Sequence, residues 1–341
     1  MKITVVHPSE LGLPELELWR ALQATRPEWR NPFLAPEFTL AVGRARPRAR
    51  VAVIEDGSRV VGFFPFEIRG KVIGKAIGAG ISDCQAVLHE PGFDFDAMAL
   101  IRACGLPVWE FDHLLADQKP FWPYHTEREG SPLMDLREGF DAYLRQRRAA
   151  TSGSIKAALR KQRKLAREWG ELKFDYGVRD PALLATLMRW KSAQYRRTGM
   201  MDRFDVPWIR QVVEELSASR ASGCAGVLSA LYAGERLIAL DFGLASVTIL
   251  VDWFPAYDRD AGKYSPGLQL ALLMAEAAAS AGIHHIDLGK GQAEFKDTLR
   301  NAELPIATGR VAPSRSVALV RSVHLRPVPT LRHTVRQLRT R

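Results

Sequence analysis

Apolar and polar positions follow the same order in the two halves of the chain. Apolar runs at 50–55 and 59–66 flank a D-G-S turn, and apolar runs at 225–232 and 236–244 flank an A-G-E turn. Two apolar runs around a short Gly-containing turn predict a β-hairpin. Each half therefore contains the same strand-turn-strand motif. Few residues are identical between the halves, so the shared motif indicates a repeat of structure rather than of sequence.

The remaining pattern alternates strands with helices. Apolar runs predict further strands at 75–79, 85–88, 108–111, 133–136, 172–176, 247–254 and 285–288. Helical spacing of apolar residues predicts helices at 14–23, 36–44, 95–103, 181–197, 207–220 and 265–281. Such alternation predicts an α/β (α+β) fold in two units, each with a mixed central sheet flanked by helices.

A strongly basic helical segment separates the two units. Between 138 and 169 the chain reads as helix, with a weak spot at T-S-G (151–153) and Ser154 as the cap of its second part. We predict four parts: an N-terminal domain at 1–137, a basic helical bridge at 138–170, a C-terminal domain at 171–309 and an Arg-rich tail at 310–341. The bridge is either a solvated amphipathic surface or a contact for phosphate-bearing substrate, RNA or membrane.

Composition narrows the class of protein. Hydrophobic residues make up 47% of the chain and charged residues 25%, as in globular proteins. No window reaches the roughly 20 apolar residues of a membrane span, and the N-terminus lacks a secretory pattern, so a cytoplasmic protein is expected. Cys84, Cys104 and Cys224 lie far apart, which favours reduced thiols over a disulfide framework or a zinc site.

The net charge of +10 is concentrated at the C-terminal end. No acidic residue follows Glu303, whereas eight arginines do. This basic tail is either solvated or attracted to anionic lipid, nucleic acid or an acidic partner.

The most informative segment runs from 252 to 296. It reads as the end of a buried strand, a basic loop, a helix opened by Ser265, Pro266 and Gly267, a second buried strand, and a Gly turn with charged residues. Ser suits a cap, Pro suits the first helical turn, and Gly allows a backbone to approach a ligand. Because a helix N-terminus attracts anions, this order predicts a phosphate or pyrophosphate site.

These motifs resemble the GNAT superfamily of acyl-CoA-dependent N-acyltransferases. More narrowly, the chain resembles the CelD/BcsL-type family of cellulose and exopolysaccharide synthesis, which is related to the FemAB-type aminoacyl transferases. The matching segments are G-E-R-L-I-A-L-D-F-G-L (234–244), W-F-P-A-Y-D (253–258), K-Y-S-P-G-L (263–268), G-I-H-H-I-D-L-G-K-G (282–291), E-F-K (294–296), W-K-S-A-Q-Y-R-R-T-G (190–199) and I-S-D-C-Q (81–85). The resemblance implies tandem GNAT-like domains, the first one degenerate.

The resemblance also implies acetyl-CoA as acyl donor, and no metal is expected. The residues expected to contact the donor are Trp253, Tyr257, Lys263, Ser265, Pro266, Gly267 and Gly289. The S-P-G sequence by itself is also simply a good helix start.

Amine acylation requires a base for the ammonium, a clamp on the thioester carbonyl and an acid for the thiolate. Asp252 and Asp241 are candidate bases, since burial in apolar strands raises a carboxyl pKa. Tyr264 is a candidate acid, with Tyr257 as the alternative. Lys296 is a candidate for stabilising a phosphate or the oxyanion.

Acceptor contacts are expected from two places. Trp190, Lys191 and Gln194 recur at helical spacing, either as a packed Trp with a solvated edge or as a surface that stacks on a sugar. Asp287 and Glu294 follow the last strand, where Asp287 suits a substrate contact or a structural cap and Glu294 suits a substrate contact or a surface ion pair.

The expected function is transfer of an acyl group, most simply acetyl, to an amino sugar or precursor of a bacterial exopolysaccharide. The basic segments would then lie near anionic lipid of the inner membrane or lipid-linked sugars. A FemAB-like transfer from aminoacyl-tRNA is the alternative, because a basic helix also suits an RNA backbone. A non-catalytic nucleotide-binding or partner-binding protein is the third hypothesis.

Overall fold

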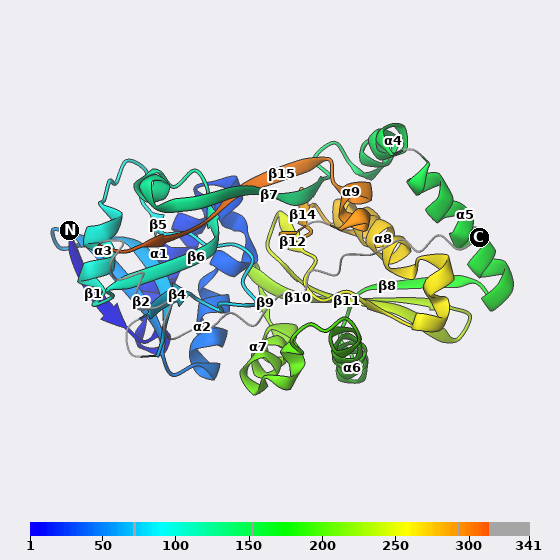
Figure 1. Cartoon of the computed structure of the whole chain (residues 1–341), viewed down its shortest axis with the longest axis horizontal. Coiled ribbons are helices and arrows are strands. Elements are labelled where there is room, and N and C mark those ends of the chain that lie inside the picture. The colour runs from blue at the N-terminus through cyan, green and yellow to red at the C-terminus, as the bar shows by residue number, and fades with distance from the viewer. Residues whose placement is uncertain (71–72, 152, 292, 314–341) are drawn as a thin grey trace, which may run out of the picture.

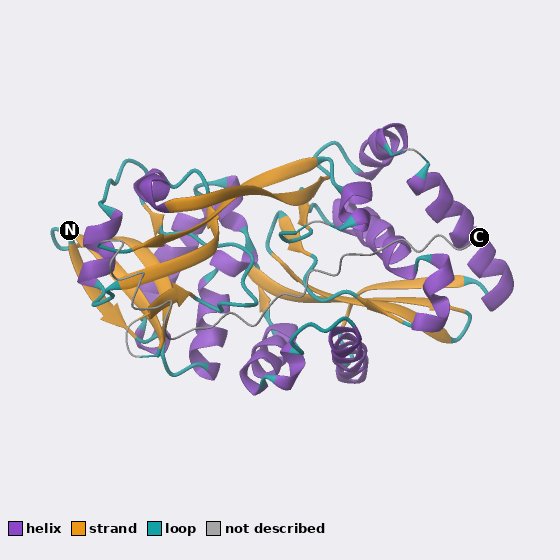
Figure 2. Ribbon diagram, viewed as in Figure 1, coloured by secondary structure: helices purple, strands orange, loops and turns teal. Residues whose placement is uncertain are grey.

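The structure is a computed structural model that describes residues 1–70, 73–151, 153–291 and 293–313. It consists of one long mixed sheet with helices packed along both faces (Figures 1 and 2). The elements of the first part are β1 (Lys2–Val6), α1 (Leu13–Ala24), α2 (Pro36–Ala45), β2 (Ala49–Asp56), β3 (Arg59–Arg69), β4 (Ile73–Ala76), β5 (Leu88–His89), α3 (Ala97–Ala103), β6 (Val108–Leu115) and β7 (His125–Asp135). Those of the second part are α4 (Phe140–Ala150), α5 (Ser154–Trp169), β8 (Leu172–Val178), α6 (Pro181–Arg197), α7 (Pro207–Ala218), β9 (Arg220–Ala221), β10 (Cys224–Ala233), β11 (Arg236–Ala245), β12 (Ile249–Val251), β13 (Ala256–Tyr257), α8 (Pro266–Ser280), β14 (His285–Asp287), α9 (Glu294–Leu299) and β15 (Ala302–Val311).

The sheet runs without a break through both halves. Its strand order is β1-β2-β3-β4-β6-β15-β7-β14-β12-β11-β10-β8. The last strand, β15, lies between β6 and β7 of the first half, and β7 pairs with β14 of the second half. A strand of each half is therefore paired within the other half. β15 extends to Val311, just past the predicted start of the tail at 310. The rest of the tail, from 314, lies outside the described residues.

Both predicted hairpins are confirmed. Asp56 pairs with Arg59 at the end of β2 and β3, and Ala233 pairs with Arg236 at the end of β10 and β11. The mixed α/β architecture is confirmed as well, with the basic segment forming α4 and α5. The helices predicted at 181–197, 207–220 and 265–281 form as α6, α7 and α8.

The strand predicted at 247–254 is wrong in its length. β12 ends at Val251, where it pairs with Leu244 of β11, whereas β13 begins at Ala256, opposite Leu240. Three residues lie between Leu240 and Leu244 on β11, but four lie between Val251 and Ala256 on the opposite side. The opposite side therefore has one extra residue, which forms a β-bulge. This bulge contains Asp252, and it ends the regular pairing beside β14.

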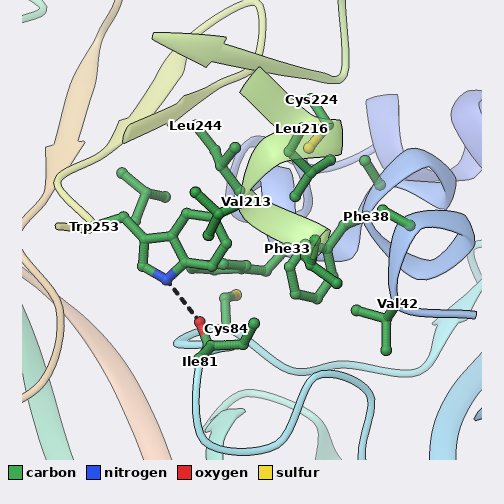
Figure 3. Close-up of a cluster of buried hydrophobic side chains, with 14 of the residues drawn as sticks. Phe33, Phe38, Val42, Ile81, Cys84, Val213, Leu216, Cys224, Leu244 and Trp253 are labelled. Atoms are coloured by element: carbon green, nitrogen blue, oxygen red, sulfur yellow. Dashed lines mark hydrogen bonds between the residues drawn. The ribbon is translucent and has the colours of Figure 1, made fainter. Parts of the chain in front are cut away.

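A shared hydrophobic core joins the two halves. Trp253, which follows the bulge, packs edge-on to Phe33 of the first half at 5.4 Å between ring centroids. Its indole N–H donates a 2.8 Å hydrogen bond to the carbonyl oxygen of Ile81 (Figure 3). Leu244 and Val213 of the second half lie in the same cluster. In the part of the chain that the structure describes, no helix has the length and hydropathy to cross a membrane.

Candidate functional site

A cleft of about 600 Å³ lies beyond the bulge, where the pairing of β12 with β14 ends. Four helices border it: α5, the N-terminal end of α8 and α9 from one face of the sheet, and α6 from the other (Figure 1). The side chains that line it include Ser154, Lys161, Lys191, Gln194, Asp241, Asp252, Tyr257, Ser265, Pro266, Gly267, Glu294 and Phe295. The structure thus brings together nine of the residues predicted from the sequence.

The N-terminal end of α8 is open toward the cleft. Ser265 occupies the cap position with φ 58° and ψ 54°, and it is the one non-glycine residue at positive φ within the described ranges. Its side chain caps no backbone N–H, because its left-handed backbone departs from the extended conformation of a capping residue. Its Oγ accepts a 2.8 Å hydrogen bond from Lys161 Nζ on α5. The N–H groups of the first helical turn have no acceptor within the helix and attract an anion.

Gly267 leaves room at this helix end. A Cβ placed there would meet only the ring of Tyr257, at 3.7 Å. Tyr257 is 41% exposed and extends from β13 along the cleft. This end of the cleft thus combines free backbone donors, the ammonium group of Lys161 and an aromatic ring, which together suit a phosphate-bearing ligand.

Two carboxyl groups lie at the inner end of the cleft. Asp241 is 2% exposed, and among the described residues neither of its oxygens accepts a hydrogen bond from a donor. Burial raises the pKa of Asp241 well above its usual value, and the negative charge of Asp252 raises that pKa further. Two adjacent carboxylates cannot bond to each other, whereas one shared proton gives a hydrogen bond between them.

Strand alternation explains why these acids meet. Leu240 and Phe242, the neighbours of Asp241 in β11, face the core shared with the first half, so Asp241 faces the cleft side. Asp252 reaches the same place because the bulge turns it out of β12, while its backbone N–H still donates to Asp287 O at 2.9 Å.

Lys191 is the cation nearest this pair from α6. It is buried, and its Nζ donates a 2.8 Å hydrogen bond to Pro255 O. Burial lowers the pKa of Lys191, and the carboxylates of Asp252 and Asp241 oppose that shift. Lys191 therefore balances part of the charge of the acidic pair.

Three residues predicted in the catalytic or donor-binding sets point away from the cleft. Tyr264 is buried against Trp169, and its hydroxyl donates to Glu168. Lys263 is exposed and lies 3.7 Å from the same carboxylate. Trp253 belongs to the hydrophobic core described above. Of the two tyrosines considered as acids, only Tyr257 lines the cleft.

Asp287 and Lys296 hold the Gly turn beside the cleft. Asp287 is buried, and its carboxylate accepts from Ser131 Oγ at 2.8 Å and from Gly289 N at 2.9 Å. Lys296 Nζ donates to the carbonyl oxygens of Gly289 and Lys290, both at 2.9 Å. Burial raises the pKa of Asp287 and lowers that of Lys296. Gly289 has φ 72°, which favours glycine, and an added Cβ would lie 3.3 Å from Asp83.

Sequence reasoning did not single out Lys161. Its basic helix was predicted, but one lysine among many cations on α5 carries no signal of its own. Only the packing of α5 against the segment before α8 selects it. Within the described ranges, no group of three or more His, Cys, Asp or Glu residues is placed to hold a metal ion.

The segment around this cleft is similar to known acetyltransferase (GNAT) domains. Residues 153–297 match the family model described as an acetyltransferase (GNAT) domain. That segment covers α5 through most of α9 and includes every lining residue of the cleft except Thr298.

Solved structures share the fold of nearly the whole chain. FemX matches with a TM-score of 0.58 at 10% identity, covering 91% of this chain and 96% of that one. The C-terminal domain of a protein described as a lysylphosphatidylglycerol synthetase from Agrobacterium fabrum has a TM-score of 0.56 at 12% identity, covering 90% and 94%. A tandem GNAT protein from the clavulanic acid biosynthesis pathway has a TM-score of 0.53 at 11% identity, covering 92% and 99%. No protein with a curated function matches the sequence significantly. These likenesses establish the tandem GNAT fold.

Proposed function

We propose that this chain transfers an acyl group, most simply acetyl from acetyl-CoA, to the amine of an amino sugar or related precursor of a bacterial exopolysaccharide. The observation that carries the proposal is the single cleft that joins an open helix N-terminus to the pair formed by buried Asp241 and half-buried Asp252. Work at the cytoplasmic face of the inner membrane fits the positive charge of the chain.

The donor's pyrophosphate fits the end of the cleft at α8. Lys161 and the free N–H groups near Gly267 supply positive potential at this end of the cleft. The three residues that open the helix, Ser265, Pro266 and Gly267, carry no negative charge that would oppose it. The acyl end of the donor then extends along the cleft toward Asp241 and Asp252.

The acids at the other end suit the chemistry. Asp252 takes a proton from the acceptor ammonium, and the free amine attacks the thioester carbonyl. The C–N bond forms, the C–S bond breaks, and the thiolate takes a proton from Tyr257, which lines the cleft. The second proton that the nitrogen must lose then returns to the Tyr257 oxygen. Asp241, kept protonated by its burial, donates to Asp252 and fixes its orientation.

Calorimetric titration with acetyl-CoA tests the donor site. Gly267→Asp places a carboxylate at the helix N-terminus and is expected to weaken binding by tenfold or more. Gly267→Ala is the matched control, because a methyl group meets only Tyr257 at an ordinary contact distance and adds no charge. No binding by the wild-type protein, or equal binding by all three proteins, overturns the proposal.

A second candidate function is transfer from aminoacyl-tRNA. The observation that favours it is the row of exposed basic side chains on α5, the helix that borders the cleft: Lys156, Arg160, Arg163, Lys164 and Arg167. Salt-dependent tRNA binding together with no acetyl-CoA binding supports this candidate, since phosphate contacts release counterions. Acetyl-CoA binding with no measurable tRNA affinity contradicts it.

A further inference from the structure

A second hollow of about 440 Å³ lies next to the cleft, on the α6 side of the sheet. Its lining is Trp190, Ala193, Gln194, Arg197, Tyr257, Asp258 and Arg259, and we call it the α6 groove. It shares Gln194 and Tyr257 with the cleft, so the two hollows are continuous at these side chains. α8 lies on the opposite face of the sheet from α6 (Figure 1).

Two arginines in the α6 groove have free guanidinium groups. Arg197 ends α6 and Arg259 follows β13; both are exposed, and neither has an ion pair or hydrogen bond with the residues that the structure describes. The one acid in the lining, Asp258, is already occupied, because Arg236 binds its Oδ2 at 2.6 Å and its Oδ1 accepts from Asp260 N at 3.0 Å. The groove therefore carries uncompensated positive charge.

Aromatic side chains flank these charges. Tyr257 is 41% exposed at the junction with the cleft, and Trp190 is only partly buried against the shared core. Aromatic surfaces of this kind pack on flat apolar faces of ligands, and guanidinium groups bind phosphate through paired hydrogen bonds.

We propose that the α6 groove binds the phosphate group of the acceptor, so that the acceptor's amine enters the cleft beside Asp252. The acceptor is then a phosphorylated amine, such as an amino sugar phosphate. This inference rests on the proposed function, because it assigns the acceptor of the same reaction. It puts donor and acceptor on opposite faces of the sheet, joined through the opening beside the bulge.

Direct binding tests the inference without turnover. Wild-type protein is titrated with glucosamine 6-phosphate and with glucosamine, in the absence of acetyl-CoA. We expect the phosphorylated sugar to bind about tenfold to hundredfold more tightly, the range of a charge-assisted contact. In the Arg197→Gln/Arg259→Gln double variant, the two sugars should bind equally weakly.

The control is Arg189→Gln, which removes one positive charge from an exposed position of α6. Arg189 donates to Thr186 on its own helix and does not line the groove. This variant should keep the preference for the phosphorylated sugar. Equal affinity of the wild-type protein for both sugars, or a preference that survives in the double variant, overturns the inference.

The donor also carries a phosphate, on its ribose, so its contribution is measured separately. Acetyl-CoA and its analogue without the 3′-phosphate are titrated into the wild-type protein and the double variant. We expect the double variant to bind both donors as the wild-type protein does. If the double variant loses affinity for acetyl-CoA but not for the analogue without the 3′-phosphate, the groove holds the donor's phosphate and the inference fails. If the wild-type protein binds neither donor, the proposed function is contradicted. The titration with the two sugars then still decides whether the α6 groove binds a phosphate group.

Discussion

Lys161 Nζ donates a 2.8 Å hydrogen bond to Ser265 Oγ, and this contact between residues 104 positions apart joins α5 to the start of α8. Ser265 would ordinarily cap α8 through its side chain. In this protein the left-handed backbone of Ser265 leaves the donors of the first turn of α8 uncapped, and the bond from Lys161 places a cation beside them. The contact therefore adds a positive charge to a helix start that already presents free backbone donors to the cleft.

Replacing Lys161 with Gln is expected to weaken acetyl-CoA binding about tenfold, because a charge-assisted contact with phosphate contributes about 1.5–3 kcal/mol. The measurement is a titration at low and at high salt, where the wild-type advantage should shrink as ions screen the charge. Lys156→Gln removes the same charge from an exposed position of α5 outside the cleft lining and serves as control. Equal affinity of both variants would show that Lys161 does not contact the donor.

Replacing Asp252 with Asn removes the proposed base while keeping its size. We expect kcat to fall by about 10²–10⁴-fold, the usual contribution of general acid–base catalysis. Acetyl-CoA affinity should stay unchanged, because the donor's phosphates bind at the other end of the cleft. Steady-state kinetics and calorimetry measure the two effects. Asp56→Asn, in the exposed β2–β3 turn, is the control and should match the wild-type protein. Full activity of the Asp252 variant would assign the base elsewhere.

Asp241 makes folding stability depend on pH. Because its pKa is raised in the folded state, the folded protein holds a proton there that the unfolded chain releases above about pH 4. Between the pKa of Asp241 in the unfolded chain and its higher pKa in the folded protein, this group lowers the free energy of unfolding by about 1.4 kcal/mol per pH unit. Asp241→Asn carries no such proton.

Urea unfolding of the wild-type protein and Asp241→Asn at pH 5, 7 and 9 measures this linkage. The variant should gain stability relative to the wild-type protein as the pH rises through this range. A difference that stays constant with pH would mean that Asp241 is ionised in the folded protein.

Asp287 is expected to stabilise the fold. Its buried carboxylate accepts from Ser131 on β7 and from Gly289, and Asn31 Nδ2 donates to it at 3.3 Å. Asp287→Ala leaves these donors unpaired, so we expect a loss of about 3 kcal/mol in the free energy of unfolding. Asp297→Ala removes an exposed acid paired with Arg300 and should change stability by less than about 1 kcal/mol. Denaturant unfolding compares the two, and equal effects would contradict the assigned role.

Local signals in the sequence predicted much of the fold. The hairpin around A-G-E and the helix that begins after Ser265 depend on neighbouring residues, and both formed as predicted. β15 was not predicted, because its residues, 302–311, contain Pro305 and a glycine and alternate weakly. Its place between β6 and β7 depends on pairing with residues about 170–200 positions away, which no local pattern reports.

The sequence by itself determined both hairpins, the mixed α/β class and the segment that opens α8, since turn chemistry and apolar spacing act over a few residues. Tertiary structure decided which residues face the cleft. Tyr257 and Tyr264 lie on the same loop region, yet packing buries Tyr264 against Trp169 and leaves Tyr257 in the cleft. Likewise the bulge after β12 brings Asp252 beside Asp241, and the packing of α5 brings Lys161 to Ser265. These contacts join residues far apart in the chain, so their geometry follows from how the whole sheet and its helices pack.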